Sequence, residues 1–114
     1  MDSLKIAIKT SRGVELLLIE EILCCIAHGR YTKIITTSGK EFLLSRVLKE
    51  IENCLSCGDF FRSHKSYLIN LNHIIHYQSN HETPITLVND VKIKLAKRRK
   101  QDFQKRLDEF AHTI

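Results

Sequence analysis

The stretch FFRSHKSYLIN, at residues 60–70, carries most of the information on the fold and the function of this chain. Between its aromatic pair and its apolar end lie four polar or basic residues, Arg62, Ser63, His64 and Lys65. Apolar anchors on both sides would hold them as an exposed loop whose side chains have little freedom left to lose. The two cations suit phosphates, and Ser63 and His64 suit phosphates or base edges. An alternative role for His64 is to tie the turn together through the backbone.

Short segments with strand character occupy much of the remaining chain. A two-residue alternation of apolar and polar side chains predicts half-buried strands, and runs of β-branched and aromatic residues predict others. On these grounds we expect strands at residues 4–9, 14–18, 22–27, 31–37, 40–44, 66–69, 74–78, 85–88 and 91–95. Asn89-Asp90 separates the last two segments as a two-residue hairpin turn would.

Two helices are predicted among these strands. Apolar residues recur at helical spacing over residues 47–55, Ser45 is a good N-cap, and Gly58 can end the helix in a left-handed conformation. A second helix is expected at about residues 97–112. Its apolar stripe contains Phe103, Leu107, Phe110 and Ala111.

The order of these elements predicts a mostly β fold, on the border of the all-β and α+β classes. Strands and helices do not alternate regularly, which disfavours a doubly wound parallel sheet. With 114 residues and 43% apolar side chains, the chain has the size and composition of one domain. No linker and no repeat of fixed period marks a boundary. We therefore predict a single domain at residues 1–114, with a core at about residues 4–110.

Positive charge is concentrated toward the C-terminus. Eight basic residues and one acidic residue lie between Lys92 and Arg106, whereas the whole chain carries a formal charge of +5. Clustered Lys and Arg side chains displace counterions from a phosphate backbone, so a nucleic acid is a fitting partner. A solvated helix face would explain the same charges.

Several other classes of protein are disfavoured. No stretch approaches the roughly 18 apolar residues of a membrane span, and the N-terminus is unlike a leader peptide. We expect a soluble, cytoplasmic protein that does not contact membranes. The sequence has no Gly-rich phosphate loop, nucleophile elbow or paired catalytic carboxylates, so we predict no enzymatic activity and no cofactor. It also lacks the interleaved aromatic residues typical of surfaces that bind single-stranded nucleic acids.

The four cysteines provide the main alternative. Cys54 and Cys57 have the CxxC spacing of zinc and thiol-redox sites. We expect Cys54 on the apolar face of its helix, however, and the adjacent Cys24 and Cys25 on opposite faces of a strand, where they cannot easily share a metal ion. The prediction is therefore four reduced structural thiols and no metal site. A cysteine-based redox sensor or a zinc-stabilised interaction module remains the alternative function.

Residues 60–70, followed by Ile74, resemble the most characteristic motif of the LytTR family of DNA-binding domains. In that motif an aromatic residue and an Arg precede a His-basic-Ser segment and an apolar strand that ends in Asn. Other stretches follow the family's order, and the resemblance covers about residues 4–110. These stretches are Glu21-Ile22, Tyr31-Thr32, Gly39-Lys40, the helical segment 48–55 and the basic turn Lys97-Arg98-Arg99.

The resemblance implies an elongated stack of short antiparallel β-sheets, with one internal and one C-terminal helix and no recognition helix. Loops of such a fold enter successive grooves on one face of duplex DNA and usually bend it. The first contact loop would run from His28 to Tyr31, with Arg30 or Tyr31 nearest the base edges. The second would be residues 62–65. The third would be the turn of Lys97, Arg98 and Arg99. Tyr31 could alternatively cap the sheet with its ring.

The family also implies partners. Its members are commonly response regulators in which a phosphorylated receiver domain promotes dimerisation on paired promoter repeats. We therefore expect double-stranded DNA as the partner, a homodimer on DNA, and a receiver domain or sensor kinase upstream. With 114 residues, the chain is too short to hold this domain and a receiver domain of about 120 residues. It is expected to be a stand-alone regulator or a C-terminal fragment.

The sequence departs from the family pattern in two places. Lys94-Leu95-Ala96-Lys97 stands where the family often has Pro, an apolar residue, Ser and Arg. A Lys cannot reproduce the two-pronged contact of Arg with guanine, so we expect Lys97 to bind phosphate. Cys24-Cys25-Ile26 stands where an acidic residue is common, and no family role is transferred to these three positions.

Overall fold

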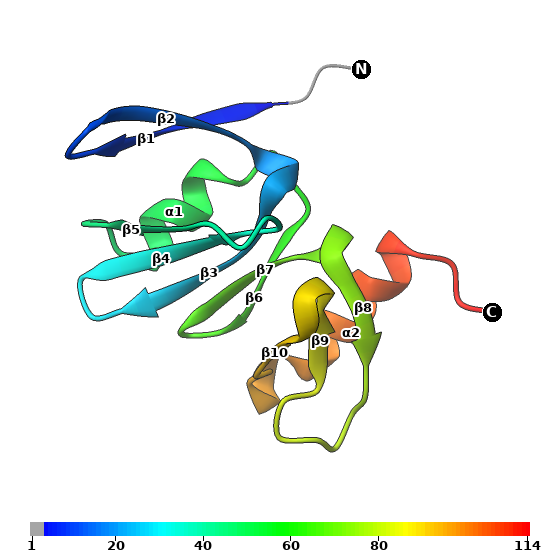
Figure 1. Cartoon of the computed structure of the whole chain (residues 1–114). Helices are drawn as coiled ribbons and strands as arrows, with labels where there is room; N and C mark the ends of the chain where they lie inside the picture. The colour runs from blue at the N-terminus through cyan, green and yellow to red at the C-terminus, as the bar shows by residue number, and fades with distance from the viewer. Residues whose placement is uncertain (1–3) are drawn as a thin grey trace.

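The computed structural model describes residues 4–114, which form mainly short antiparallel strands (Figure 1). The strands are β1 (Lys5–Thr10), β2 (Gly13–Leu18), β3 (Ile22–His28), β4 (Tyr31–Thr36), β5 (Glu41–Leu44), β6 (Phe60–His64), β7 (Tyr67–Asn70), β8 (Ile74–Tyr77), β9 (Ile85–Leu87) and β10 (Val91–Ile93). The α-helices are α1 (Leu48–Cys54) and α2 (Lys100–Phe110). Residues 1–3, part of the N-terminus that argued against a leader peptide, lie outside the described residues.

Three antiparallel sheets are stacked along the molecule. The central five-stranded sheet has the order β5-β4-β3-β7-β6, and it lies between the β1-β2 hairpin and a three-stranded sheet of order β10-β9-β8. Figure 1 shows the hairpin above the central sheet and the three-stranded sheet below it. The molecule measures 45 × 36 × 24 Å along its principal axes. The predicted mostly β fold, built as an elongated stack of sheets, is confirmed.

Both faces of the central sheet are buried. On one face, Ile8 of β1 and Ile51 of α1 pack in a cluster that includes Cys25. On the other face, the three-stranded sheet and Phe103 of α2 pack in a cluster that includes Cys24. The two cysteines contribute to different cores because successive side chains of a strand point to opposite faces, as predicted. Burial on both sides also explains why β3 is almost entirely apolar.

The turn between β9 and β10 lies where the sequence predicted a hairpin, but its connection is one residue longer than predicted. Asn89 has φ of 64° and Asp90 has φ of 59°. Two consecutive positive φ values are characteristic of a type I′ turn, which matches the twist of the flanking strands. Val91 pairs with Leu87 across the hairpin, so the connection contains three residues, Val88, Asn89 and Asp90, and not the predicted two.

The ends of α1 differ from the prediction. The helix begins at Leu48, with Val47 at the N-cap and no side-chain capping bond, so Ser45 is not the cap. Gly58 does not adopt the left-handed conformation that was expected after the helix. A small residue is required there for another reason, because a Cβ atom at Gly58 would lie 2.8 Å from Cε2 of Phe60.

The closing helix is shorter than predicted. Lys97–Arg99 form a 3-10 helix, and α2 follows it. Phe103 is fully buried, with its ring centroid 5.4 Å from that of Phe61 and 4.9 Å from that of Tyr77. Phe110, from the same predicted stripe, remains 37% exposed. Phe103 is therefore the main anchor of α2. Within residues 4–114, no helix is long and apolar enough to span a bilayer.

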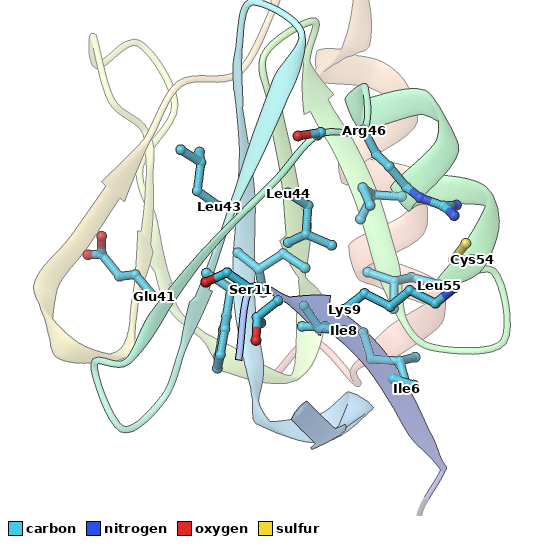
Figure 2. Close-up of a pocket in the computed structure, with 16 residues that line it drawn as sticks. Ile6, Ile8, Lys9, Ser11, Glu41, Leu43, Leu44, Arg46, Cys54 and Leu55 are labelled. Atoms are coloured by element: carbon cyan, nitrogen blue, oxygen red, sulfur yellow. The ribbon is translucent and has the colours of Figure 1, made fainter. Parts of the chain in front are cut away.

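A groove of about 870 Å³ lies between β1 and the neighbouring β5 and α1 (Figure 2). Its lining includes apolar side chains such as Ile6, Leu44 and Leu55, together with Lys9 and Arg46. None of the described residues that line it belongs to a predicted contact loop. The groove is therefore separate from the cationic surface described next.

Candidate nucleic-acid interface

The three turns that the sequence predicted as contact loops lie at one end of the central sheet. The β3-β4 turn, at residues 28–31, adjoins the β6-β7 turn because the amide of Ala27 donates to the carbonyl of Ser66 at 2.9 Å. The basic 3-10 helix joins them because the amide of Ala96 donates to the carbonyl of Ser63 at 2.8 Å. Figure 1 shows all three along the lower left of the molecule. Three segments that are far apart in the sequence thus form one edge of the molecule. We call it the contact edge, and it consists of the turns at residues 28–31, 65–66 and 97–99.

The first turn presents its side chains to solvent. His28 and Tyr31 are the last pair of the β3-β4 hairpin, and Gly29 turns the chain with φ of 58°, a left-handed value that favours glycine. His28, Arg30 and Tyr31 are all exposed. Because Tyr31 is 47% exposed, its ring is open to a partner and does not seal the core.

The second turn differs from the exposed loop that was predicted. Strand β6 includes residues 62–64 at the edge of the central sheet, and Arg62 and His64 pair with β7 on either side of a register shift at Ser63. The turn proper therefore consists of Lys65 and Ser66. The side chain of Ser63 is fully buried and cannot reach a ligand at the surface. Lys65 is exposed. The prediction of a four-residue loop was therefore wrong, because only its last residue leaves the strand.

Arg62 is engaged within the protein. Its Nη1 donates to Oε1 of Glu52 at 2.9 Å, its Nε to the carbonyl of His64 at 3.1 Å, and its Nη2 to the carbonyl of Lys65 at 2.6 Å. The side chain is 17% exposed. These three hydrogen bonds hold the guanidinium of Arg62 in one position against the protein.

The third turn combines exposed and anchored cations. Lys97 and Arg98 are exposed, whereas Arg99 is half-buried and its Nη1 donates to the carbonyl of Arg62 at 3.1 Å. Among the described residues, Nε of Arg99 and Oγ of Ser63 are buried polar atoms with no hydrogen-bond partner. Arg99 therefore attaches the 3-10 helix to β6, and the other two cations face solvent.

His64 closes the β6-β7 turn in its neutral form. Its Nδ1 accepts a hydrogen bond from the amide of Ser66 at 3.1 Å, which requires that nitrogen to be unprotonated. The pKa of His64 is lowered, mainly by partial burial and then by the charges of Lys65, Lys94, Arg99 and Arg62. His64 thus ties the turn together through the backbone, which was its alternative predicted role.

Replacing His64 by Asn should reduce the loss of stability in mild acid. The folded protein binds this proton more weakly than the unfolded chain, so the free energy of unfolding falls as the pH drops below about 6.5 toward the lower folded pKa. The Oδ1 atom of Asn can accept the Ser66 amide without titrating. We expect urea denaturation to show a smaller stability decrease for His64→Asn than for the parent between about pH 7.5 and 5.5. Identical decreases would contradict this account, and His112→Asn, at the exposed chain end, is the control.

Lys94 is a cation of this surface that the sequence analysis did not select. It is exposed, directly after β10, and its charge contributes to the lowered pKa of His64. The signal that could have identified it is the alternation of Lys92 and Lys94 with apolar residues over residues 91–95. A two-residue period on a strand places such side chains on one outer face.

The cysteines form two separate pairs. Cys24 and Cys25 are buried, and burial raises the pKa of both thiols, that of Cys24 to about 12. Cys54 and Cys57 are exposed, so the prediction that Cys54 lies on the apolar face of its helix was wrong. Among residues 4–114, no group of three or more His, Cys, Asp or Glu side chains is arranged to hold a metal ion. The described geometry therefore does not favour the zinc alternative.

Thiol titration of the folded protein should distinguish these pairs. The thiolate is the reactive form, so we expect an aromatic disulfide reagent to modify Cys54 and Cys57 rapidly. Cys24 and Cys25 should react only after unfolding. Cys54→Ser/Cys57→Ser should abolish the rapid phase and leave DNA affinity within about twofold of the parent, since neither residue lies in a contact turn. Rapid modification of all four thiols would contradict the burial of the β3 pair.

The stacked sheets and their cationic edge define a β-sheet domain suited to binding nucleic acids. Comparison with known proteins identifies the family: the chain belongs to the LytTr DNA-binding domain family, whose model matches residues 12–108. It is similar to the solved LytTr DNA-binding domain of a methyl-accepting/DNA response regulator from Bacillus cereus, with a TM-score of 0.76. That alignment covers 94% of this chain and 98% of the other at 23% identity, so it shows the fold.

One curated relative is the transcriptional regulatory protein NatR of Bacillus subtilis (strain 168). It is 33% identical to this chain over 75 residues, which cover 66% of this chain and 32% of NatR. The match thus spans about a third of the length of that relative. The family and the general function that the sequence predicted, that of a DNA-binding domain, are confirmed by the family match.

Proposed function

We propose that this domain binds duplex DNA through the three turns at the end of the central sheet. The observation that carries the proposal is the pair of hydrogen bonds, from Ala27 to Ser66 and from Ala96 to Ser63, that hold these turns along one edge. A rigid row of cations on one edge fits the phosphates of a double helix, and fixed side chains between them can reach base edges.

Each turn has a distinct role in this proposal. The exposed cations Lys65, Lys97 and Arg98 bind phosphates and supply most of the affinity. The β3-β4 turn, with His28, Arg30 and Tyr31, supplies base contacts and therefore selectivity. The buried or internally bonded residues of the predicted site support these contacts from within. They are Arg62, Ser63, His64 and Arg99.

The proposal extends to the role of this domain in transcription regulation. NatR is described as a transcriptional regulatory protein and the Bacillus cereus protein as a response regulator. By analogy, this domain is the DNA-binding output domain of a transcription regulator. It has no enzymatic activity, and it binds chromosomal DNA in the cytoplasm. A receiver domain or sensor kinase upstream controls it, and a homodimer occupies paired promoter repeats.

In vitro selection of duplex DNA, followed by affinity measurements over a range of salt concentrations, tests this function. We expect a selected duplex to bind more tightly than a random duplex. The logarithm of the affinity should fall linearly with the logarithm of the salt concentration, by about 0.9 for each neutralised phosphate. Equal affinities for both duplexes, or an affinity independent of salt, would contradict the proposal.

A further inference from the structure

Arg62 differs from the other cations near the contact edge in the number of its internal bonds. Its guanidinium donates to two consecutive carbonyls of the β6-β7 turn, those of His64 and Lys65, and to the carboxylate of Glu52 on α1. A planar fork held by three acceptors has a fixed position and orientation. The turn is therefore attached to α1 through one side chain.

The anchor on α1 is itself rigid. Ile51, next to Glu52, is buried in the core beneath the helix. The Arg62–Glu52 pair is separated by 2.9 Å, and its side chains are 17% and 31% exposed. The Arg46–Glu50 pair on the same helix is separated by 3.8 Å, and its side chains are 57% and 55% exposed. Coulomb attraction is stronger between charges that are closer together and less exposed to solvent. The Arg62–Glu52 pair is therefore the stronger constraint.

The backbone of β6 transmits this constraint to the third turn. The carbonyl of Arg62 accepts from Nη1 of Arg99 at 3.1 Å, and the next carbonyl, of Ser63, accepts from the amide of Ala96. Residues 62 and 63 of β6 thus include the guanidinium that binds Glu52 and also hold the basic 3-10 helix through their carbonyls. A shift of this segment would displace the exposed Lys65 and Lys97 together.

We infer that Arg62 is a positioning residue for DNA binding and not a phosphate contact, and that Glu52 is its partner in this role. The inference rests on the proposed function. The guanidinium fixes the carbonyls of the β6-β7 turn, so Lys65 meets the DNA backbone in one orientation. An acidic residue that would by charge alone repel DNA therefore promotes DNA binding.

A comparison of Glu52→Ala with Glu50→Ala tests this inference. Both variants remove one negative charge from α1, but only the first removes the partner of Arg62. If charge alone mattered, the two variants would have the same affinity for DNA, and that affinity would equal or slightly exceed the affinity of the parent. We expect Glu52→Ala to bind about tenfold more weakly than Glu50→Ala, because a charge-assisted hydrogen bond that orders the turn is lost. Equal affinities, or tighter binding by Glu52→Ala, would overturn the inference.

Arg62→Lys provides a second test that keeps the positive charge. A single ammonium group cannot hold three acceptors in one plane, so this variant should also bind about tenfold more weakly. The dependence of its affinity on salt should match the parent, because no phosphate contact is lost. Parent-like affinity for Arg62→Lys, together with a salt slope smaller by about 0.9 for Arg62→Ala, would identify a phosphate contact instead.

Backbone relaxation measured by NMR without DNA separates the two proposals. In Glu52→Ala and Arg62→Lys, the amides of Lys65 and Ser66 should gain fast motion, whereas Glu50→Ala should match the parent. An ordered turn in both variants would overturn the inference even if the parent binds DNA. Failure of the folded parent to bind any selected duplex would instead overturn the proposed function.

Discussion

Removing the three exposed cations of the second and third turns, in Lys65→Ala/Lys97→Ala/Arg98→Ala, should reduce DNA affinity on the order of a hundredfold near physiological salt. Each neutralised phosphate contributes about 0.9 to the salt slope, so three lost contacts should make the slope shallower by about 2.7. Titration of the selected duplex at several salt concentrations measures both quantities. The side chains are exposed, so their loss should not unfold the domain.

A charge-matched triple variant provides the control. Lys5→Ala/Arg12→Ala/Lys49→Ala also removes three exposed positive charges, from β1, the β1-β2 turn and α1. Charges farther from the DNA than the Debye length, about 8 Å at physiological salt, are largely screened. We expect a change in affinity of less than about fivefold and an unaltered slope. Similar losses in both triple variants would mean that net charge, and not the contact edge, determines binding.

Phe103→Ala should be the most destabilising single substitution that we predict. The side chain is fully buried, between Phe61 and Tyr77, and it anchors α2 to the face of the central sheet that contains Cys24. Truncation of a buried Phe typically costs about 3–5 kcal/mol of stability, through lost transfer free energy and the cavity that remains. This is a large part of the roughly 5–15 kcal/mol by which domains are stable. Urea unfolding followed by circular dichroism measures the change.

Phe110→Ala is the matched control on the same helix. Phe110 is 37% exposed, so its truncation should cost less than about 1 kcal/mol. The basic 3-10 helix directly precedes α2, and Phe103→Ala should consequently weaken DNA binding even under conditions where the rest of the domain stays folded. Equal unfolding free energies for the two variants would show that α2 does not depend on Phe103.

The sequence predicted the architecture well because local patterns follow from burial. The almost continuous apolar run of β3 reflects a strand buried on both faces, and Asn89-Asp90 adopts the positive φ values that its turn requires. Residues 60–70 identified the family. The turns at residues 28–31 and 97–99 also lie where they were expected. These features are determined by residues close together in the sequence and by the pattern of apolar side chains along one strand or helix.

The errors concern features that only tertiary structure determines. Ser63 and Arg62 are polar and resemble loop residues in the sequence, yet they belong to an edge strand whose outer carbonyls bind the distant residues Ala96 and Arg99. The partner of the Arg62 guanidinium lies on α1, at a spacing that no local pattern reveals. Gly58 was expected to adopt a left-handed conformation, but a glycine is needed there because a Cβ atom would collide with the side chain of Phe60. The location of the cationic turns at residues 28–31 and 97–99 could be predicted, whereas the hydrogen bonds that attach these turns to the sheet could not.

The most direct test of the central claim is a map of backbone amide NMR shifts during titration with the selected duplex. We predict that the largest changes occur together at residues 28–31, 64–67 and 94–99, at one DNA concentration range. The amides of the β1-β2 hairpin, β5 and α1 should change little. Large changes confined to those elements, with the three turns unaffected, would contradict the assignment of the contact edge.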